Sequence, residues 1–183
     1  IWQGGGDDHS SGKRFAPNIP TEEIFTMPHR DRVNGTVKAT KPLSYNGNII
    51  DGFSVTFKDG RVISFEAEQG GDVFQDLLDT DEGAKHLGEI ALVPHSSPIS
   101  QSGILFFNTL FDENAACHIA LGRAYANTIA GGTDMDPDQF MEAGGNTSQT
   151  HVDFMIGNHD VDIDGITLDG DREPVMRQGE WAF

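Results

Sequence analysis

Alternating apolar and polar residues predict strands along much of the chain, and the clearest case begins at His151. Successive side chains of a strand face opposite ways, so Val152, Phe154 and Ile156 would face a core. His151 and Asp153 would share the other face, about 6.6 Å apart along the chain. A rigid strand that presents a histidine and an aspartate on one face is suited to hold a metal ion. An ordinary half-buried strand has the same pattern, so the choice between a metal site and a simple strand depends on the other candidate ligands in the chain.

Two more regions favour extended structure. Residues 18–26 contain a proline and β-branched residues, and adjacent strand residues face opposite ways, so only one of Glu22 and Glu23 can face a given site. Residues 33–69 alternate as antiparallel strands with a turn at Lys58-Asp59-Gly60.

The helical signals are fewer. Helical spacing of apolar residues after Gly71, with Asp72 as a cap, predicts one helix, and 82–87 predicts a second short one. Residues 1–17 and 131–149 are rich in Gly, Ser, Asp or Asn and are expected to be loops, the first an irregular segment near a domain junction. The expected fold class is α+β, with an antiparallel or mixed sheet and a few helices packed on it.

Ionisable residues interrupt stretches that otherwise resemble core. Glu89 enters the apolar run that ends at Pro94, which is costly unless the carboxylate is paired or metal-bound, although a solvent-facing strand start is the simpler explanation. His118 lies among small apolar residues, where a hydrogen-bonded core histidine is the common case. Tyr125 follows seven residues later, by two helical turns or by a strand and a turn, and could converge with it.

Charge and cysteine content restrict the function. The net charge is −17, with 29 acids against 12 lysines and arginines, so nucleic acid and anionic membrane are improbable partners. A single cysteine, Cys117, excludes an intramolecular disulfide framework and a thiolate-rich zinc site. No apolar run reaches the roughly 20 residues that span a bilayer. A cytoplasmic location fits these features.

Carboxylates and imidazoles without thiolates suit Zn, Co, Mn or Mg. One catalytic zinc needs three protein ligands, so a larger set indicates two divalent ions, which would activate a water for attack on an electrophile. A glycosidase that uses two of the acids is a rival, which the histidines disfavour. Asp160 to Gly165 begins like a calcium loop, but Asp171 stands where glutamate is needed, and an exposed edge strand explains the pattern better.

Four motifs in order resemble the thermophilic metalloaminopeptidase family, which includes aminopeptidases T and S. They are Pro20-Thr21-Glu22-Glu23-Ile24-Phe25-Thr26, Leu87-Gly88-Glu89-Ile90-Ala91-Leu92-Val93-Pro94, Phe107-Asn108-Thr109-Leu110-Phe111-Asp112-Glu113-Asn114-Ala115-Ala116-Cys117-His118 and His151-Val152-Asp153-Phe154-Met155-Ile156-Gly157. The resemblance runs from about Trp2 to Trp181. It implies an enzyme that releases N-terminal residues from peptides with a free N-terminus.

The resemblance also implies a two-metal site. The matching positions for its ligands are Glu23, Glu89, His118, Tyr125, His151 and Asp153, with Glu89 bridging both ions. Glu113 matches an acid near the metals, as either a ligand or the general base, and Tyr125 is a second candidate catalytic residue. His95, Asn108 and Asn114 are candidates for outer contacts to metal ligands or substrate.

The domain organisation implied is that of a C-terminal catalytic half, residues 18–183, without the family's N-terminal domain. The chain begins without methionine or a signal peptide, as a processed or partial chain would. The resemblance implies a homodimer for the full-length enzyme. The alternative function is a folded fragment that lacks activity and binds metal weakly or not at all.

Overall fold

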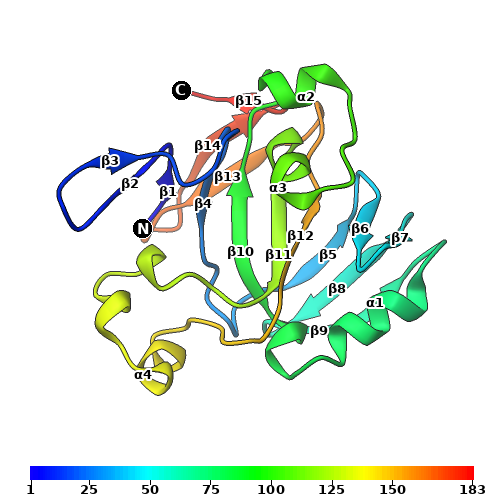
Figure 1. The fold of residues 1–183 in the computed structure, drawn as a ribbon, viewed down its shortest axis with the longest axis horizontal. Helices are drawn as coiled ribbons and strands as arrows, with labels where there is room; N and C mark the ends of the chain where they lie inside the picture. The colour runs from blue at the N-terminus through cyan, green and yellow to red at the C-terminus, as the bar shows by residue number, and fades with distance from the viewer.

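The computed structural model describes residues 1–183, which form antiparallel sheets and a few short helices (Figure 1). The strands are β1 (Gln3–Gly4), β2 (Asp7–Asp8), β3 (Arg14–Phe15), β4 (Ile24–Thr26), β5 (Gly35–Lys38), β6 (Leu43–Tyr45), β7 (Asn48–Ile50), β8 (Ser54–Lys58), β9 (Arg61–Glu66), β10 (Leu87–Leu92), β11 (His118–Gly122), β12 (His151–Met155), β13 (Ile163–Ile166), β14 (Arg172–Arg177) and β15 (Glu180–Trp181). The helices are α1 (Gly71–Leu78), α2 (Pro98–Ser102), α3 (Thr109–Asp112) and α4 (Pro137–Glu142), with 3-10 turns η1 (Gly83–Lys85), η2 (Glu113–Ala115), η3 (Ala126–Thr128) and η4 (Gly132–Asp134). The α+β prediction is confirmed.

The five-stranded sheet positions the chemistry. Its order is β1-β4-β10-β11-β12, and β4, β10, β11 and β12 lie side by side at the centre of Figure 1. All its pairings are antiparallel. Ala120 in the middle strand β11 pairs with Glu89 of β10 on one side and with Asp153 of β12 on the other. The β10–β11 register shifts between Leu87 and Glu89, and such an irregularity re-aims the side chains beside it. Three adjacent strands, β10, β11 and β12, therefore carry candidate ligands, and Glu23 immediately precedes the neighbouring strand β4.

The opposite face of this sheet is buried in the main core. Val152 and Phe154 pack there with Phe53 and Phe74, and the ring centroids of Phe53 and Phe154 are 5.1 Å apart. Helix α1 and the β5-β8-β9 sheet supply much of the remaining core. The alternation predicted from His151 onward is thus confirmed: the apolar residues face the core, and the polar face is left for other contacts.

The local signals were accurate where turn chemistry was strong. The β8–β9 hairpin turns at Asp59 and Gly60, both with positive φ as a tight hairpin turn requires. The edge-strand expectation near Asp164 is also met, because β13 lies at the edge of the β13-β14-β15 sheet.

Three helix expectations need correction. Gly70, not Asp72, is the N-cap of α1, and Asp72 lies in the first turn. The helix expected over 82–87 is only the three-residue turn η1, because β10 already begins at Leu87. The loop expected over 131–149 contains α4, whose Asp136 and Gln139 form a reciprocal capping box.

The segment 1–17 is more ordered than its composition indicated. It forms β1, β2 and β3, and β1 pairs with β4 so that Gln3 lies opposite Phe25. The Gln3 side-chain amide also donates to the Asn127 carbonyl oxygen at 2.8 Å. These contacts hold the segment against the central sheet. No helix has the length and apolar character needed to cross a membrane.

Candidate metal centre

Five of the predicted ligands meet on the polar face of the central sheet. His118 Nε2 lies 3.0 Å from Glu23 Oε2 and 3.6 Å from Glu89 Oε1. His151 Nε2 lies 3.6 Å from Glu89 Oε2 and 3.4 Å from Asp153 Oδ1. Residues separated by up to 130 positions are therefore within a few ångströms of one another.

Glu89 belongs to two ligand groups. Glu23, Glu89 and His118 form one, and Glu89, His151 and Asp153 form the other, with the potential ligand atoms of each group within 4.8 Å of one another. The two oxygens of Glu89 face different histidines, Oε1 toward His118 and Oε2 toward His151. A carboxylate placed in this way can bind one cation through each oxygen.

Backbone contacts orient both imidazole rings. His118 Nδ1 lies 3.0 Å from the Ala116 carbonyl oxygen, and His151 Nδ1 lies 2.7 Å from the Arg123 carbonyl oxygen. When Nδ1–H donates to a carbonyl, Nε2 is the nitrogen left to bind a metal, which is the usual outer arrangement for metal-binding histidines. Both rings therefore present Nε2 to the carboxylates.

Three buried polar atoms of the cluster make no hydrogen bond of good geometry, although each lies within ion-pair distance of another group of the cluster, and this bears on whether the residues fit a metal. They are His118 Nε2, Glu23 Oε2 and Asp153 Oδ1, of which the first two are close together. Leaving such groups unpaired costs about 1–3 kcal/mol each, and more when they are charged. Hard or borderline divalent cations match this donor set of imidazole and carboxylate, so the residues fit the metals expected for the site.

The charges within the cluster perturb its histidines strongly. Burial would lower the pKa of His118, but its ion pairs with Glu23 and Glu89 outweigh burial and raise the pKa well above its usual value. Burial is likewise outweighed at His151, where Asp153 raises the pKa to about 9. Without metal, protons on the imidazoles offset the carboxylate charge, and divalent cations would have to displace them.

An open pocket of about 410 Å³ lies over the cluster. Its lining residues are Asp7, Pro17, Asn18, Glu23, Phe25, Glu89, Leu110, Glu113, Tyr125, Asn127, His151 and Asp153. His118 is fully buried behind them. The pocket gives a substrate access to the edge of the ligand groups.

Glu113 and Tyr125 line this pocket beside the two ligand groups. Glu113 belongs to neither group. Burial, and then the charges of Asp153 and Glu23, raise the pKa of Glu113 to about 8. Tyr125 packs against the His151 ring with centroids 4.9 Å apart, and burial followed by the charge of Glu89 raises its pKa.

The three candidates for outer contacts lie away from the pocket lining. His95 Nδ1 lies 3.1 Å from the Ser100 hydroxyl, the Asn108 side chain caps α3, and the Asn114 side chain accepts from the Glu22 backbone N–H. Only Asn114 acts next to a predicted ligand, by holding the backbone one residue before Glu23. His95 and Asn108 make their hydrogen bonds away from the predicted ligands, and an outer role for them stays a prediction.

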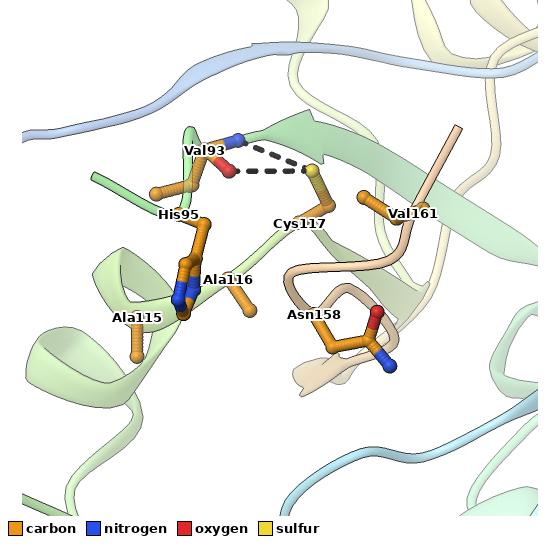
Figure 2. Close-up of a pocket in the computed structure, with 7 residues that line it drawn as sticks. All are labelled: Val93, His95, Ala115, Ala116, Cys117, Asn158 and Val161. Carbon is orange, nitrogen blue, oxygen red and sulfur yellow. Dashed lines mark hydrogen bonds between the residues drawn. The ribbon is translucent and has the colours of Figure 1, made fainter. Parts of the chain in front are cut away.

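His95 instead borders a small cavity around Cys117 (Figure 2). The cavity measures about 10 Å³, room for at most one water. The Cys117 sulfur contacts the Val93 backbone nitrogen and carbonyl oxygen, each at 3.4 Å, as the dashed lines in Figure 2 mark. Cys117 is a buried packing residue here, and burial raises the pKa of its thiol.

Sequence patterns did not predict several lining residues. Two of them, Asp7 and Pro17, lie in the segment expected to be irregular, and Asn18 follows it directly. Two others, Leu110 and Asn127, lie on short helical turns. Only the apolar character of Leu110 and its place in the third motif hinted at a role. Their position depends on how distant segments dock, which local patterns do not report.

Comparison with known proteins assigns the chain to a family. It is 61% identical over 183 residues to Aminopeptidase 2 of Geobacillus stearothermophilus and 56% identical to Aminopeptidase AmpS of Bacillus subtilis, covering the whole chain in both cases. It covers only 44% and 45% of those two proteins. The structure of AmpT from Thermus thermophilus superposes with a TM-score of 0.93 at 49% identity, over the whole chain and 45% of AmpT.

The chain thus spans less than half the length of these curated relatives. A 2,5-dihydroxypyridine dioxygenase of Pseudomonas putida shares the fold alone, at 15% identity, a TM-score of 0.56 and coverage of 87% of this chain and 43% of that one. The family model described as thermophilic metalloprotease (M29) matches residues 1–181. The chain therefore belongs to the M29 family of thermophilic metalloproteases.

Proposed function

We propose that these residues form the catalytic region of a metal-dependent aminopeptidase that releases N-terminal residues from peptides through a pair of divalent ions. The observation that carries the proposal is Glu89, whose two oxygens face two separate ligand groups at the base of an open pocket. The relatives bear the name aminopeptidase, which gives the reaction class.

The proposed ligands divide between two positions. Glu23 and His118 would hold one ion, His151 and Asp153 the other, and Glu89 both. Tyr125, beside His151, is proposed as a further ligand or as a contact to the substrate. When bound, the ions supply Lewis acidity toward the scissile carbonyl and lower the pKa of water.

Glu113 is proposed to move the proton. Its carboxyl lines the pocket outside both ligand groups, close enough to Asp153 and Glu23 for their charges to raise its pKa. Cations at those two residues would cancel these like charges, leaving burial as the remaining cause of a raised pKa. A carboxylate so tuned can take a proton from the attacking water and give it to the leaving amine.

The reaction itself is tested by amino-acid release. Purified protein is incubated with an unblocked peptide and with its N-acetylated counterpart, before chelation, after chelation and after addition of Co²⁺ or Zn²⁺. We expect release from the unblocked peptide only, its loss on chelation and its return with metal. Equal cleavage of the acetylated peptide, or full activity after exhaustive chelation, would contradict the proposal.

The assignment of Glu23 as a ligand can be tested against its neighbour Glu22, which serves as a matched control. Glu23→Gln is expected to weaken binding of one ion by more than about 100-fold, beyond the 10–100-fold typical of outer contacts, because it removes a buried carboxylate beside His118. Glu22→Gln makes the same change one residue away, outside both ligand groups, and should leave uptake unchanged. Calorimetric titration with Zn²⁺ measures both, and equal effects of the two variants would refute the assignment.

The second candidate is a folded region that binds metal weakly on its own. It is favoured by the chain's coverage of less than half of its relatives. We propose that residues 18–183, with the segment 1–17 packed against them, form the catalytic domain and that the full-length enzyme is a cytoplasmic homodimer. To test this candidate, metal titration and peptide hydrolysis are measured for residues 1–183 and for a full-length form. Tight uptake of two ions and activity by residues 1–183 alone would exclude it.

A further inference from the structure

A narrow crevice adjoins the metal-facing pocket on the side of the N-terminal segment. Its volume is about 50 Å³, enough for a few water-sized groups. It shares six lining residues with the larger pocket, so the two are continuous: Asp7, Pro17, Asn18, Glu23, Phe25 and Asn127. The crevice can take a compact polar group.

Several contacts fix the wall of this crevice. Gln3 in β1 pairs with Phe25 in β4, and its side-chain amide donates to the Asn127 carbonyl oxygen. Asp7 pairs with Phe15 in the short β2–β3 ribbon, which brings Asp7 to the crevice. The position of Asp7 is therefore built by the fold, although the residue is exposed to solvent.

The negative charge of Asp7 is not needed to balance two divalent ions, unlike the charges of the other carboxylates that line the pocket. Two divalent ions would carry four positive charges, which equals the number of carboxylates among the remaining lining residues: Glu23, Glu89, Glu113 and Asp153. No lysine or arginine lines the pocket. Asp7 Oδ1 accepts from the Asp8 backbone N–H at 2.8 Å, and no ion pair involves Asp7, so Oδ2 is available to a cation.

Two amide side chains add unused hydrogen-bonding capacity beside Asp7. Asn127 contributes only its backbone carbonyl to the contact with Gln3, and the side chains of Asn18 (half-buried) and Asn127 (exposed) both line the crevice. An ammonium group has three donors and no acceptor, so one carboxylate and two amide oxygens are a complementary set.

We propose that Asp7, together with Asn18 and Asn127, binds the α-ammonium group of the peptide substrate. This assignment rests on the proposed aminopeptidase function and names the group that this part of the pocket recognises. Glu23 lines the crevice and also belongs to a ligand group, so an N-terminus held in the crevice brings the first peptide bond toward the ligand groups. An N-acetylated peptide has neither the charge nor the compact shape for the crevice, so recognition by Asp7 makes the enzyme an exopeptidase.

Adjacent aspartates in β2 provide a matched test in the full-length, metal-loaded protein. Asp7→Asn is expected to raise KM for an unblocked leucyl peptide about tenfold with little change in kcat, because it removes a charge-assisted contact made equally in ground and transition states. Asp8→Asn removes the same charge from a residue outside the pocket and should leave KM unchanged. Asp7→Glu keeps the charge and should recover most of the affinity.

A binding readout complements the kinetics. Leucinamide, which carries a free amine, should inhibit Asp7→Asn about tenfold more weakly than the unsubstituted enzyme. Acetylated leucinamide should inhibit both equally. Equal KM values for Asp7→Asn and Asp8→Asn in an enzyme that still rejects blocked peptides would overturn the Asp7 assignment alone, whereas cleavage of blocked peptides by the unsubstituted enzyme would overturn the aminopeptidase function itself.

Discussion

Glu89→Gln is expected to remove both metal ions and reduce peptide hydrolysis to background. Each oxygen of Glu89 faces a different histidine, 3.6 Å from His118 Nε2 and 3.6 Å from His151 Nε2, so one substitution weakens both positions. The amide nitrogen of glutamine cannot bind a cation, and one negative charge is lost from a side chain that is 6% exposed. Metal content after dialysis, with the rate of amino-acid release, measures the effect.

A control for this variant is Glu66→Gln, which changes an exposed glutamate of β9 outside both ligand groups. It should retain both ions and full activity. Retention of one ion at unchanged affinity by Glu89→Gln would contradict the bridging role. Circular dichroism and thermal unfolding of the metal-free variants separate loss of binding from loss of fold.

Glu113→Gln is expected to keep both ions while kcat falls by about 10²–10⁴-fold. Glutamine has nearly the shape of glutamate but cannot accept and return a proton, and Glu113 lies outside both ligand groups. The raised pKa of Glu113, caused first by burial, is typical of a carboxyl that exchanges protons near neutral pH. Metal content and steady-state kinetics are measured on the same preparation.

The matched control for Glu113→Gln is Glu142→Gln, an exposed glutamate near the end of α4. Its kcat and metal content should equal those of the unsubstituted protein. Loss of one ion from Glu113→Gln would make Glu113 a ligand and would contradict the proton-transfer role. An unchanged kcat with both ions bound would also contradict it.

Local signals predicted much of the secondary structure because they depend on neighbouring residues only. The Asp59-Gly60 turn and the apolar face of β12 follow from backbone conformation and side-chain alternation. Such signals missed α4, although Asp136 and Gln139 are spaced as a capping box, because glycine-rich surroundings favoured a loop. They also placed the cap of α1 two residues late, since glycine caps through its conformation and leaves no polar side chain to detect.

For the site, the resemblance selected residues that the local patterns left ambiguous. Sequence alternation could not separate Glu22 from Glu23, and the structure has Glu23 buried beside His118. The same reasoning treated His118 and Glu89 each as more simply explained by ordinary core or surface packing. The unsatisfied buried Nε2 of His118 and the burial of Glu89 appear only when β10, β11 and β12 lie together, since burial depends on the whole neighbourhood.

The sequence alone determined the α+β class, the two faces of the strand from His151 to Met155, the absence of a thiolate-rich site and, through its motifs, the family. Only the tertiary structure decided that Glu89 lies between two ligand groups and that Asp7 reaches the same pocket. The physical reason is distance along the chain. Alternation and capping act over a few residues, whereas the pocket joins segments from Asp7 to Asp153, whose positions depend on sheet order, register and the packing of the core behind them.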